Sequence, residues 1–148
     1  YTGVCAIFSS RIKNRRPPLV YEDGLQSRDF VHVEDVVRAN LLVMESPKAD
    51  YDTFNVGSGK ATSILEIANT LIHLYQSPVR PQVVGKYRSG DIRHCFADIS
   101  RLVSLGYTPR WSLRDGLKDL VSWGETQKAK DLSEKADQEL LKRGLRQQ

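Results

Sequence analysis

The sequence has few cysteines and prolines and no long apolar run, and each shortage argues against a class of protein. Cys5 and Cys95 are the two cysteines in 148 residues. They form neither a CxxC motif nor a Cys/His metal spacing, so neither a disulfide framework nor a metal site is indicated. No run of apolar residues approaches the length of about 20 residues that is needed to cross a bilayer. The N-terminus carries no basic leader or cleavage site. We therefore expect a soluble, cytoplasmic protein with no membrane partner.

The overall composition is that of an ordinary folded chain with a basic balance. Hydrophobic residues make up 40% and charged residues 27%, which predicts a compact globular unit rather than a disordered tail. The net charge of +4 and the pI near 9.1 would attract a polyphosphate. The only dense basic group is at residues 11–16, however, without interleaved aromatic residues to stack bases. A solvated helix end is the better interpretation, and we expect no nucleic-acid partner.

Apolar periodicity and capping residues predict helices that alternate with short strands. Ser63 and Glu66 form a capping box before the strongest helical stripe, and Pro17 ends the first helical pattern. Period-2 runs bounded by turn residues predict the strands. We predict helices at 4–12, 34–44, 64–75, 98–106 and from 113 onward, strands at 19–21, 30–33, 53–56, 82–84 and 96–97, and a polar loop at 85–94.

The last 24 residues differ from the rest of the chain. From Lys128, small and apolar residues recur at helical spacing among mixed charges, and Glu139 with Arg143 forms a favourable i,i+4 pair. We predict a domain at 1–124 and a charged helical tail at 125–148. A surface helix that packs on its own domain is favoured over a partner-binding helix.

The Gly57-Ser58-Gly59 turn does not complete a dinucleotide-binding fingerprint. Thr62 stands where a third glycine is needed, and no acidic residue follows at about 20 positions to bind a ribose. We interpret the segment as a tight turn before a capped helix. We therefore predict no cofactor-binding residue in this chain.

Three arginines are candidates for anion binding. Arg28, Arg88 and Arg93 stand beside loops, and a guanidinium group binds diphosphate oxygens in a bidentate way. Asp29 and Asp91 lie close to them in sequence, so plain salt bridges are the alternative. No Ser/His/Asp or Cys/His arrangement follows from the spacing, and no catalytic residue is predicted.

Four ordered segments carry a family resemblance. They are LVYEDGLQSRDFVHVEDV from Leu19, FNVGSG from Phe54, YRSGDIR from Tyr87, and ADIS from Ala97 followed by LGYTP from Leu105. Together they resemble the nucleotide-sugar epimerases and dehydratases of the extended short-chain dehydrogenase family, up to Trp123. The UDP-glucose 4-epimerase-like and dTDP-L-rhamnose 4-epimerase-like members are the most similar. The resemblance implies an α/β fold that is the C-terminal substrate-binding part of that enzyme, with the N-terminal Rossmann core missing.

The resemblance also implies substrate-binding roles at five matching positions. Arg28 and Arg88 would contact the diphosphate from two sides, and Asp91 would accept hydrogen bonds from the ribose hydroxyls. Asn55 would help to hold the nucleotide, and the segment from Pro18 to Tyr21 would lie against the pyrimidine. The substrate implied is a UDP- or dTDP-sugar.

Two positions depart from the family pattern, and a third helps to choose between an epimerase and a dehydratase. Ser89 replaces a usual proline, which loosens the loop around Arg88, and Glu22 stands where glycine is common. Family dehydratases for thymidine-linked glucose tend to carry histidine where Asp91 stands, so Asp91 favours an epimerase.

The family's catalytic apparatus is not in this sequence. The glycine-rich NAD loop and the Tyr-x-x-x-Lys pair belong to a preceding half, and none of the six tyrosines has lysine four positions later. The resemblance implies an intact homodimeric, NAD-dependent 4-epimerase that works through a 4-keto intermediate, whereas this chain alone is inactive. A dehydratase, decarboxylase or reductase of the same family and a non-catalytic binding module remain alternatives. Without the other half, the helices at 33–44 and 64–75 are expected to leave apolar faces bare and to promote self-association.

Overall fold

The computed structural model describes residues 3–88, 90–144 and 146–147, with the side chains at 88, 133, 137, 140, 146 and 147 outside that description. The chain forms two compact units, each assembled from separated stretches. Unit 1 contains residues 1–26, 63–93 and 117–148, and unit 2 contains residues 27–62 and 94–116. The division into a domain at 1–124 and a tail at 125–148 stays a prediction.

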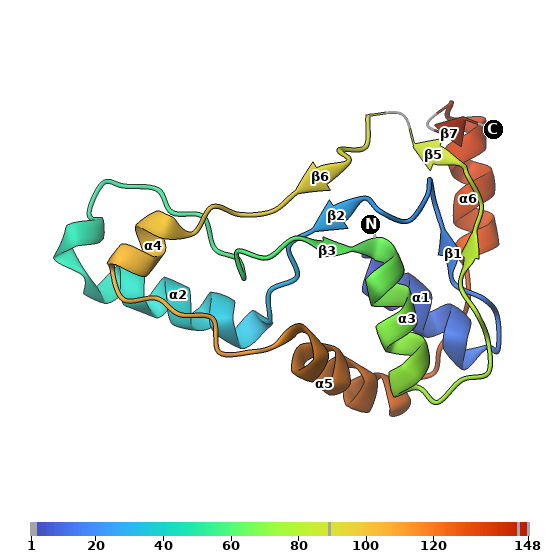
Figure 1. The fold of residues 1–148 in the computed structure, drawn as a ribbon, viewed down its shortest axis with the longest axis horizontal. Helices are drawn as coiled ribbons and strands as arrows, with labels where there is room; N and C mark the ends of the chain where they lie inside the picture. The colour runs from blue at the N-terminus through green and yellow to red at the C-terminus, as the bar shows by residue number, and fades with distance from the viewer. Residues whose placement is uncertain (1–2, 89, 145, 148) are drawn as a thin grey trace. The chain divides into compact units, whose positions relative to one another are not determined.

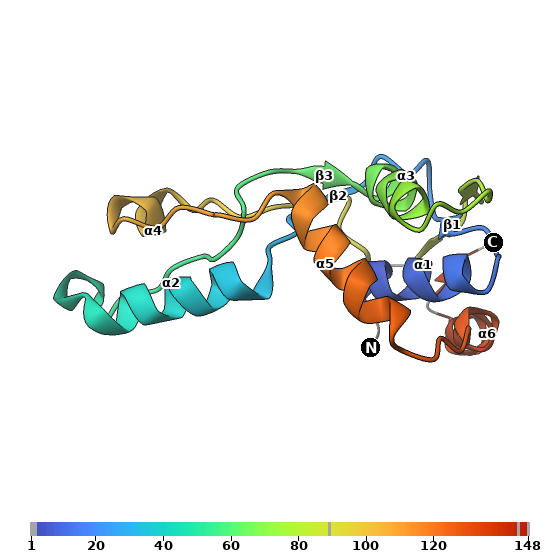
Figure 2. The same ribbon diagram turned by 90° about the horizontal axis from the view of Figure 1, so that it is seen from below.

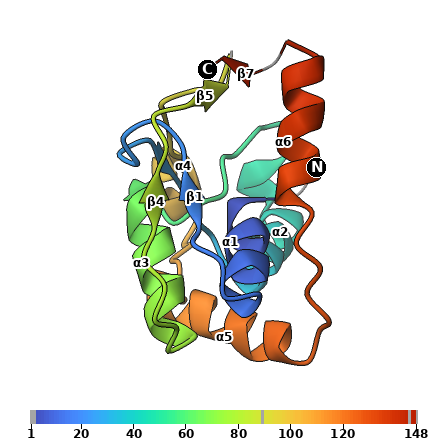
Figure 3. The same ribbon diagram turned by 90° about the vertical axis from the view of Figure 1, so that its right-hand side faces the viewer.

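Unit 1 combines helices with two pairs of very short strands. β1 and β4 pair in parallel, with Leu19 opposite Gln82, and β5 pairs antiparallel with β7 (Figures 1 and 3). Its elements are α1 (Val4–Lys13), β1 (Leu19–Val20), α3 (Ile64–Leu74), β4 (Gln82–Val83), β5 (Tyr87–Arg88), most of α5 (Leu113–Glu125), α6 (Ser133–Lys142) and β7 (Arg146–Gln147).

The core of unit 1 lies where α1 packs against α3. Phe8 and Ile12 of α1 are buried, as are Ile67 and Leu71 of α3 and Val20 of β1. Full burial of each such side chain stabilises the fold by roughly 1.5–3 kcal/mol. The expectation that the helix at 64–75 leaves its apolar face bare is therefore wrong, because α1 of the same chain lies against α3.

Unit 2 is built around a three-stranded sheet and three helical segments. The strand order is β3-β2-β6, and β2 and β6 are parallel. Ala39, Leu102 and Tyr107 form its core, and α4 lies beside α2 (Figure 2). Its elements are β2 (Ser27–Arg28), α2 (Val33–Glu45), the 3-10 helix η1 (Pro47–Ala49), β3 (Thr62–Ser63, ending at the unit boundary), β6 (His94–Cys95), α4 (Ser100–Ser104) and the start of α5.

A buried carboxylate at the start of α2 holds the segment before α5. Asp35, 1% exposed, accepts hydrogen bonds from Arg38 Nη1 at 2.7 Å, the Arg110 amide at 3.0 Å and the Trp111 amide at 3.1 Å. A buried charge is tolerated when it is paired and fully hydrogen-bonded in this way. Asp35 therefore fixes the chain where it enters α5.

The strand predictions were partly wrong, and long-range contacts explain the errors. The predicted strand at 30–33 is replaced by β2 at Ser27–Arg28, because His32 Nδ1 accepts the Glu34 amide and α2 begins at Val33. Residues 53–56 form no strand, since the Thr53 carbonyl accepts Arg101 Nη1 instead of a ladder partner. The predicted loop at 85–94 contains β5 and the start of β6, and the strand predicted at 96–97 lies at His94–Cys95. The strands at 19–21 and 82–84 and the helices were confirmed within a few residues.

One face of α2 carries an exposed apolar stripe. Val33, Val37, Leu41 and Met44 follow helical spacing, and Val33 is 67% and Met44 81% exposed. For this helix the expectation of a bare apolar face is confirmed. An exposed stripe of this kind is typical of a surface that another protein surface covers.

We expect the isolated chain to self-associate through this stripe. Light scattering across a concentration series should show a rising mean mass, and the double variant Val37→Lys/Met44→Lys should lower it towards the monomer. Ser104→Lys, at an exposed position of α4 in the same unit and outside the stripe, is the control. A monomer at every concentration would contradict this prediction.

Candidate functional site

Asp29 is the centre of the hydrogen-bond network in unit 2. Its carboxylate accepts the Ser58 amide at 2.8 Å, the Ser58 hydroxyl at 2.6 Å, the Gly59 amide at 3.0 Å and the Ala97 amide at 3.3 Å. Hydrogen bonds to an ionised carboxylate are stronger than those between neutral groups. Asp29 thus joins three segments that lie far apart in the sequence.

The turn at 57–59 is packed tightly against this carboxylate. A Cβ atom on Gly57 would lie 2.4 Å from Asp29 Oδ2 and 2.7 Å from the Ala97 Cβ, so only glycine fits. The Tyr107 hydroxyl donates to the Gly57 carbonyl at 3.0 Å, and burial, helped by the charge of Asp35, raises the pKa of Tyr107. Because Asp29 takes the amides of this turn, they do not form a phosphate cradle, which agrees with the tight-turn interpretation.

Arg28 immediately precedes this network. It lies half-buried on β2, and its backbone partner on β6 is Cys95. Its Nη1 donates to the Ser27 carbonyl at 2.8 Å, and the Ser27 hydroxyl lies 2.9 Å from His94 Nδ1. The strand pair and these bonds set the direction from which the guanidinium group leaves the sheet.

Asn55 lies exposed in the irregular segment before the turn. Its Nδ2 donates to the Asp98 carbonyl at 3.3 Å, which ties it to the segment that follows β6. The Asp98 carboxylate accepts the Ser100 amide at 2.9 Å, and this bond lowers the pKa of Asp98. Asn55 and Arg28 therefore belong to one hydrogen-bonded framework in unit 2.

Tyr21, Arg88 and Asp91 all lie in unit 1. The ladder between β1 and β4 continues through a bond from the Glu22 amide to the Lys86 carbonyl at 2.8 Å, so the residue after Tyr21 meets the residue before β5. Tyr21 is half-buried and its carbonyl accepts Gln26 Nε2 at 3.0 Å. Arg88 is the second residue of β5, and Asp91 is exposed in the turn that follows. Ser89 lies outside the described residues.

Arg93 closes this turn from its far end. Its guanidinium group donates to Glu22 Oε2 and Asp23 Oδ2, both at 2.7 Å. The bond from Arg93 lowers the pKa of Asp23, and Asp23 in turn raises the pKa of Arg93. The segment at 86–93 is thus connected at both ends to the turn at 21–23.

Comparison with known proteins places these residues in a family. The model of the NAD dependent epimerase/dehydratase family matches residues 1–57. The chain is 40% identical over 124 residues to a dTDP-L-rhamnose 4-epimerase from Burkholderia thailandensis, covering 83% of the chain and 34% of that relative. It is 33% identical over 122 residues to a UDP-glucose 4-epimerase from Mycolicibacterium smegmatis, covering 82% and 38%. The chain belongs to the NAD dependent epimerase/dehydratase family.

A solved member of the epimerase/dehydratase family confirms the fold class. The crystal structure of UDP-glucose 4-epimerase with UDP-glucose from Thermotoga maritima superposes with a TM-score of 0.77 at 35% identity, covering 84% of this chain and 40% of that one. The chain spans between a third and two fifths of the length of the relatives it matches. The predicted α/β fold of an extended short-chain dehydrogenase is thereby confirmed.

The five predicted site residues are divided between the two units. Arg28 and Asn55 lie in unit 2, and Tyr21, Arg88 and Asp91 lie in unit 1. Their substrate-binding roles stay predictions.

Among residues 3–88, 90–144 and 146–147, no group of three His, Cys, Asp or Glu side chains is placed to hold a metal ion.

Sequence reasoning missed the part that Asp29 takes in this framework. The aspartate was considered only as an ion-pair partner of a neighbouring arginine, whereas it binds amides 29 and 68 positions away. No spacing in the sequence marks contacts over such separations. The one available signal was Gly57, because a glycine in such a turn allows another segment to approach the backbone closely.

Within the part of the chain that the structure describes, no helix is long and apolar enough to cross a membrane.

Proposed function

We propose that this chain is the nucleotide-sugar-binding part of an NAD-dependent nucleotide-sugar 4-epimerase. The observation that carries the proposal is the match to a dTDP-L-rhamnose 4-epimerase and a UDP-glucose 4-epimerase over about four fifths of the chain. The bonds that hold Arg28 and Asn55 in unit 2, and the turn of Asp91 in unit 1, support it. A substrate-binding residue needs such support to keep its geometry.

The proposed roles follow from the chemistry of a nucleoside diphosphate. Arg28 and Arg88 each present guanidinium donors to diphosphate oxygens, because this planar fork matches a pair of anionic oxygens. Asp91 accepts hydrogen bonds from the ribose hydroxyls, and Asn55 holds the nucleotide through its amide. Tyr21 and its segment lie against the pyrimidine.

The chain anchors the substrate while chemistry takes place elsewhere in the longer enzyme. When bound to the preceding half, NAD supplies a hydride acceptor that makes reversible oxidation at C4 of the sugar possible. The residues of this chain hold the nucleotide throughout, so that the sugar can turn and be reduced on its other face. Tight binding of the non-reacting nucleotide provides the free energy for such positioning.

The experiment compares the isolated chain with a longer protein that includes the reading frame upstream of Tyr1. The isolated chain should give no NAD reduction with any UDP- or dTDP-hexose and should bind UDP or dTDP weakly at most. The longer protein should interconvert C4 epimers, and its upstream segment should encode a glycine-rich loop and Tyr-x-x-x-Lys. A natural start codon directly before Tyr1 would instead support a binding module, and release of a dehydrated product would support a dehydratase.

A further inference from the structure

The end of the chain lies beside the segment that carries Arg88 and Asp91. β7 pairs antiparallel with β5, with Gln147 opposite Tyr87 and Arg146 opposite Arg88 (Figure 3). Asp91 follows the end of β5 by three positions in the sequence. The C-terminal residues therefore supply backbone partners at the start of a segment to which the proposed function gives a binding role.

Such a short pair needs help from elsewhere in the molecule. A two-residue ladder contributes few backbone hydrogen bonds, and an isolated two-stranded pair is marginal in water. A tether changes this balance, because it makes the encounter of the two strands intramolecular and raises their effective concentration. Two sets of contacts hold the tail on α1 before it reaches β7.

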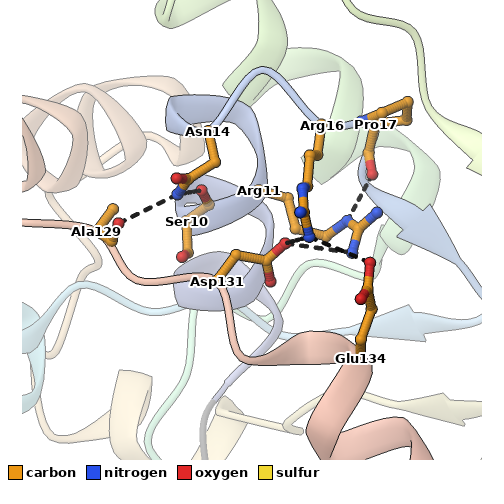
Figure 4. Close-up of polar contacts among 8 residues, drawn as sticks. All are labelled: Ser10, Arg11, Asn14, Arg16, Pro17, Ala129, Asp131 and Glu134. Atoms are coloured by element: carbon orange, nitrogen blue, oxygen red, sulfur yellow. Dashed lines mark hydrogen bonds and ion pairs between the residues drawn. The ribbon is translucent and has the colours of Figure 1, made fainter.

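The first part of the tether fastens the end of α5 to the end of α1. Lys13 Nζ donates to the Gly124 carbonyl at 2.5 Å and to the Gln127 carbonyl at 2.6 Å. A lysine at this position adds a charged donor to carbonyls at a helix end. Asn14 Nδ2 then donates to the Ala129 carbonyl at 3.2 Å (Figure 4).

The second part of the tether is a cluster of charges around the Asp131 side chain, just before α6. The Asp131 side chain is 6% exposed and accepts Arg16 Nη1 at 3.2 Å and Arg11 Nη1 at 3.5 Å (Figure 4). Arg11 is itself buried and its Nε donates to the Pro17 carbonyl at 2.6 Å. Glu134 also binds Arg16, at 3.1 Å, but its side chain is 73% exposed. Breaking a buried pair is costly and breaking an exposed one is not, so Asp131 is the main anchor.

We propose that the tail at 126–147 is a positioning element for the nucleotide-binding segment at 87–91. Asp131 anchors the tail on α1, α6 carries it onward, and β7 adds a strand to β5. This pairing fixes β5 and with it the position of Asp91. The inference rests on the proposed function only for the nature of the ligand. Its consequence is that residues far from any ligand set the affinity for the nucleotide.

Hydrogen exchange tests the strand pairing without any ligand. In the chain ending at Gly144, amides of the peptide at 86–93 should exchange about tenfold faster than in the whole chain, because local opening costs less free energy. Asp131→Asn should act in the same direction. Glu134→Gln, which removes the exposed carboxylate beside the same arginine, is the matched control and should leave exchange at 86–93 unchanged. Equal exchange in all four proteins would overturn the proposal.

Calorimetry tests the link to the nucleotide. With UDP as the probe and the longer protein as the receptor, removal of residues 145–148 should weaken binding about fivefold, since part of the segment must then be ordered on binding. The midpoint of urea unfolding should stay the same, which separates positioning from global stability. Faster exchange with unchanged UDP affinity would overturn the positioning role. If UDP binds neither form, the proposed function fails, and with it the ligand part of this inference, whereas the exchange result still decides the strand pairing.

Discussion

Replacing Asp29 by alanine is expected to lower the free energy of unfolding of unit 2 by about 3 kcal/mol. Four donors from Ser58, Gly59 and Ala97 converge on this carboxylate, and the substitution leaves them without their acceptor. A donor deprived of its partner costs its full desolvation penalty, which is larger than the net value of the hydrogen bond. Unfolding in urea, followed by Trp111 fluorescence in a Trp123→Phe background, measures the loss.

Two further variants make the Asp29 experiment specific. Asp29→Asn keeps the shape but replaces one acceptor oxygen by a donor, so an intermediate loss is expected. Asp52→Asn is the control, because Asp52 is an exposed aspartate of the same unit that binds Arg101 and the Thr53 amide. It should lose much less stability. Equal unfolding midpoints for Asp29→Ala and the unsubstituted chain would show that the carboxylate does not hold the segments together.

Replacing Arg28 by alanine is expected to weaken UDP binding to the longer protein about 100-fold, if the proposed function holds. Removing one partner of a hydrogen-bonded charge pair leaves the diphosphate with one counter-charge fewer, which typically costs several kcal/mol. Arg28→Lys keeps the charge but loses the bidentate fork, so a loss of about tenfold is expected. Isothermal titration with UDP gives the three dissociation constants.

The control for Arg28 is another arginine of unit 2. Arg114 is exposed on the first turn of α5 and has no proposed binding role, so Arg114→Ala should leave the dissociation constant unchanged. A thermal melt of each variant shows whether the fold is retained. An Arg28→Ala protein that is folded and binds UDP as tightly as the unsubstituted one would remove Arg28 from the site.

Local signals predicted the helices well and the strands poorly. Ser63 and Ser112 cap α3 and α5 through hydrogen bonds that span only three residues, and such signals can be read from neighbouring positions. The strands contain two residues each, and in the pairs β1–β4, β2–β6 and β5–β7 the partners lie 58 to 67 positions apart in the sequence. A run of that length carries no periodicity, so β2, β5 and β6 were misplaced or missed.

The candidate site was predicted from a different kind of information. Arg28, Arg88 and Asp91 were selected by the ordered motifs of the family, because spacing alone favoured plain salt bridges at these positions. What the sequence could not supply was the support around them. Arg93 was considered as a ligand for an anion, yet it holds Glu22 and Asp23. The anchoring of the tail by Asp131 likewise depends on Arg11, 120 positions earlier.

The interleaved order of the two units has a consequence for synthesis on the ribosome. Unit 2 is complete once residue 116 has emerged, whereas unit 1 also requires the stretch from 117 to 148. At about 5–20 residues per second, α1 must wait roughly 6–24 s after its own translation before Asp131 is made. During that interval Arg11 has no anchor from the tail, although α3, which packs against α1, is made well before Asp131.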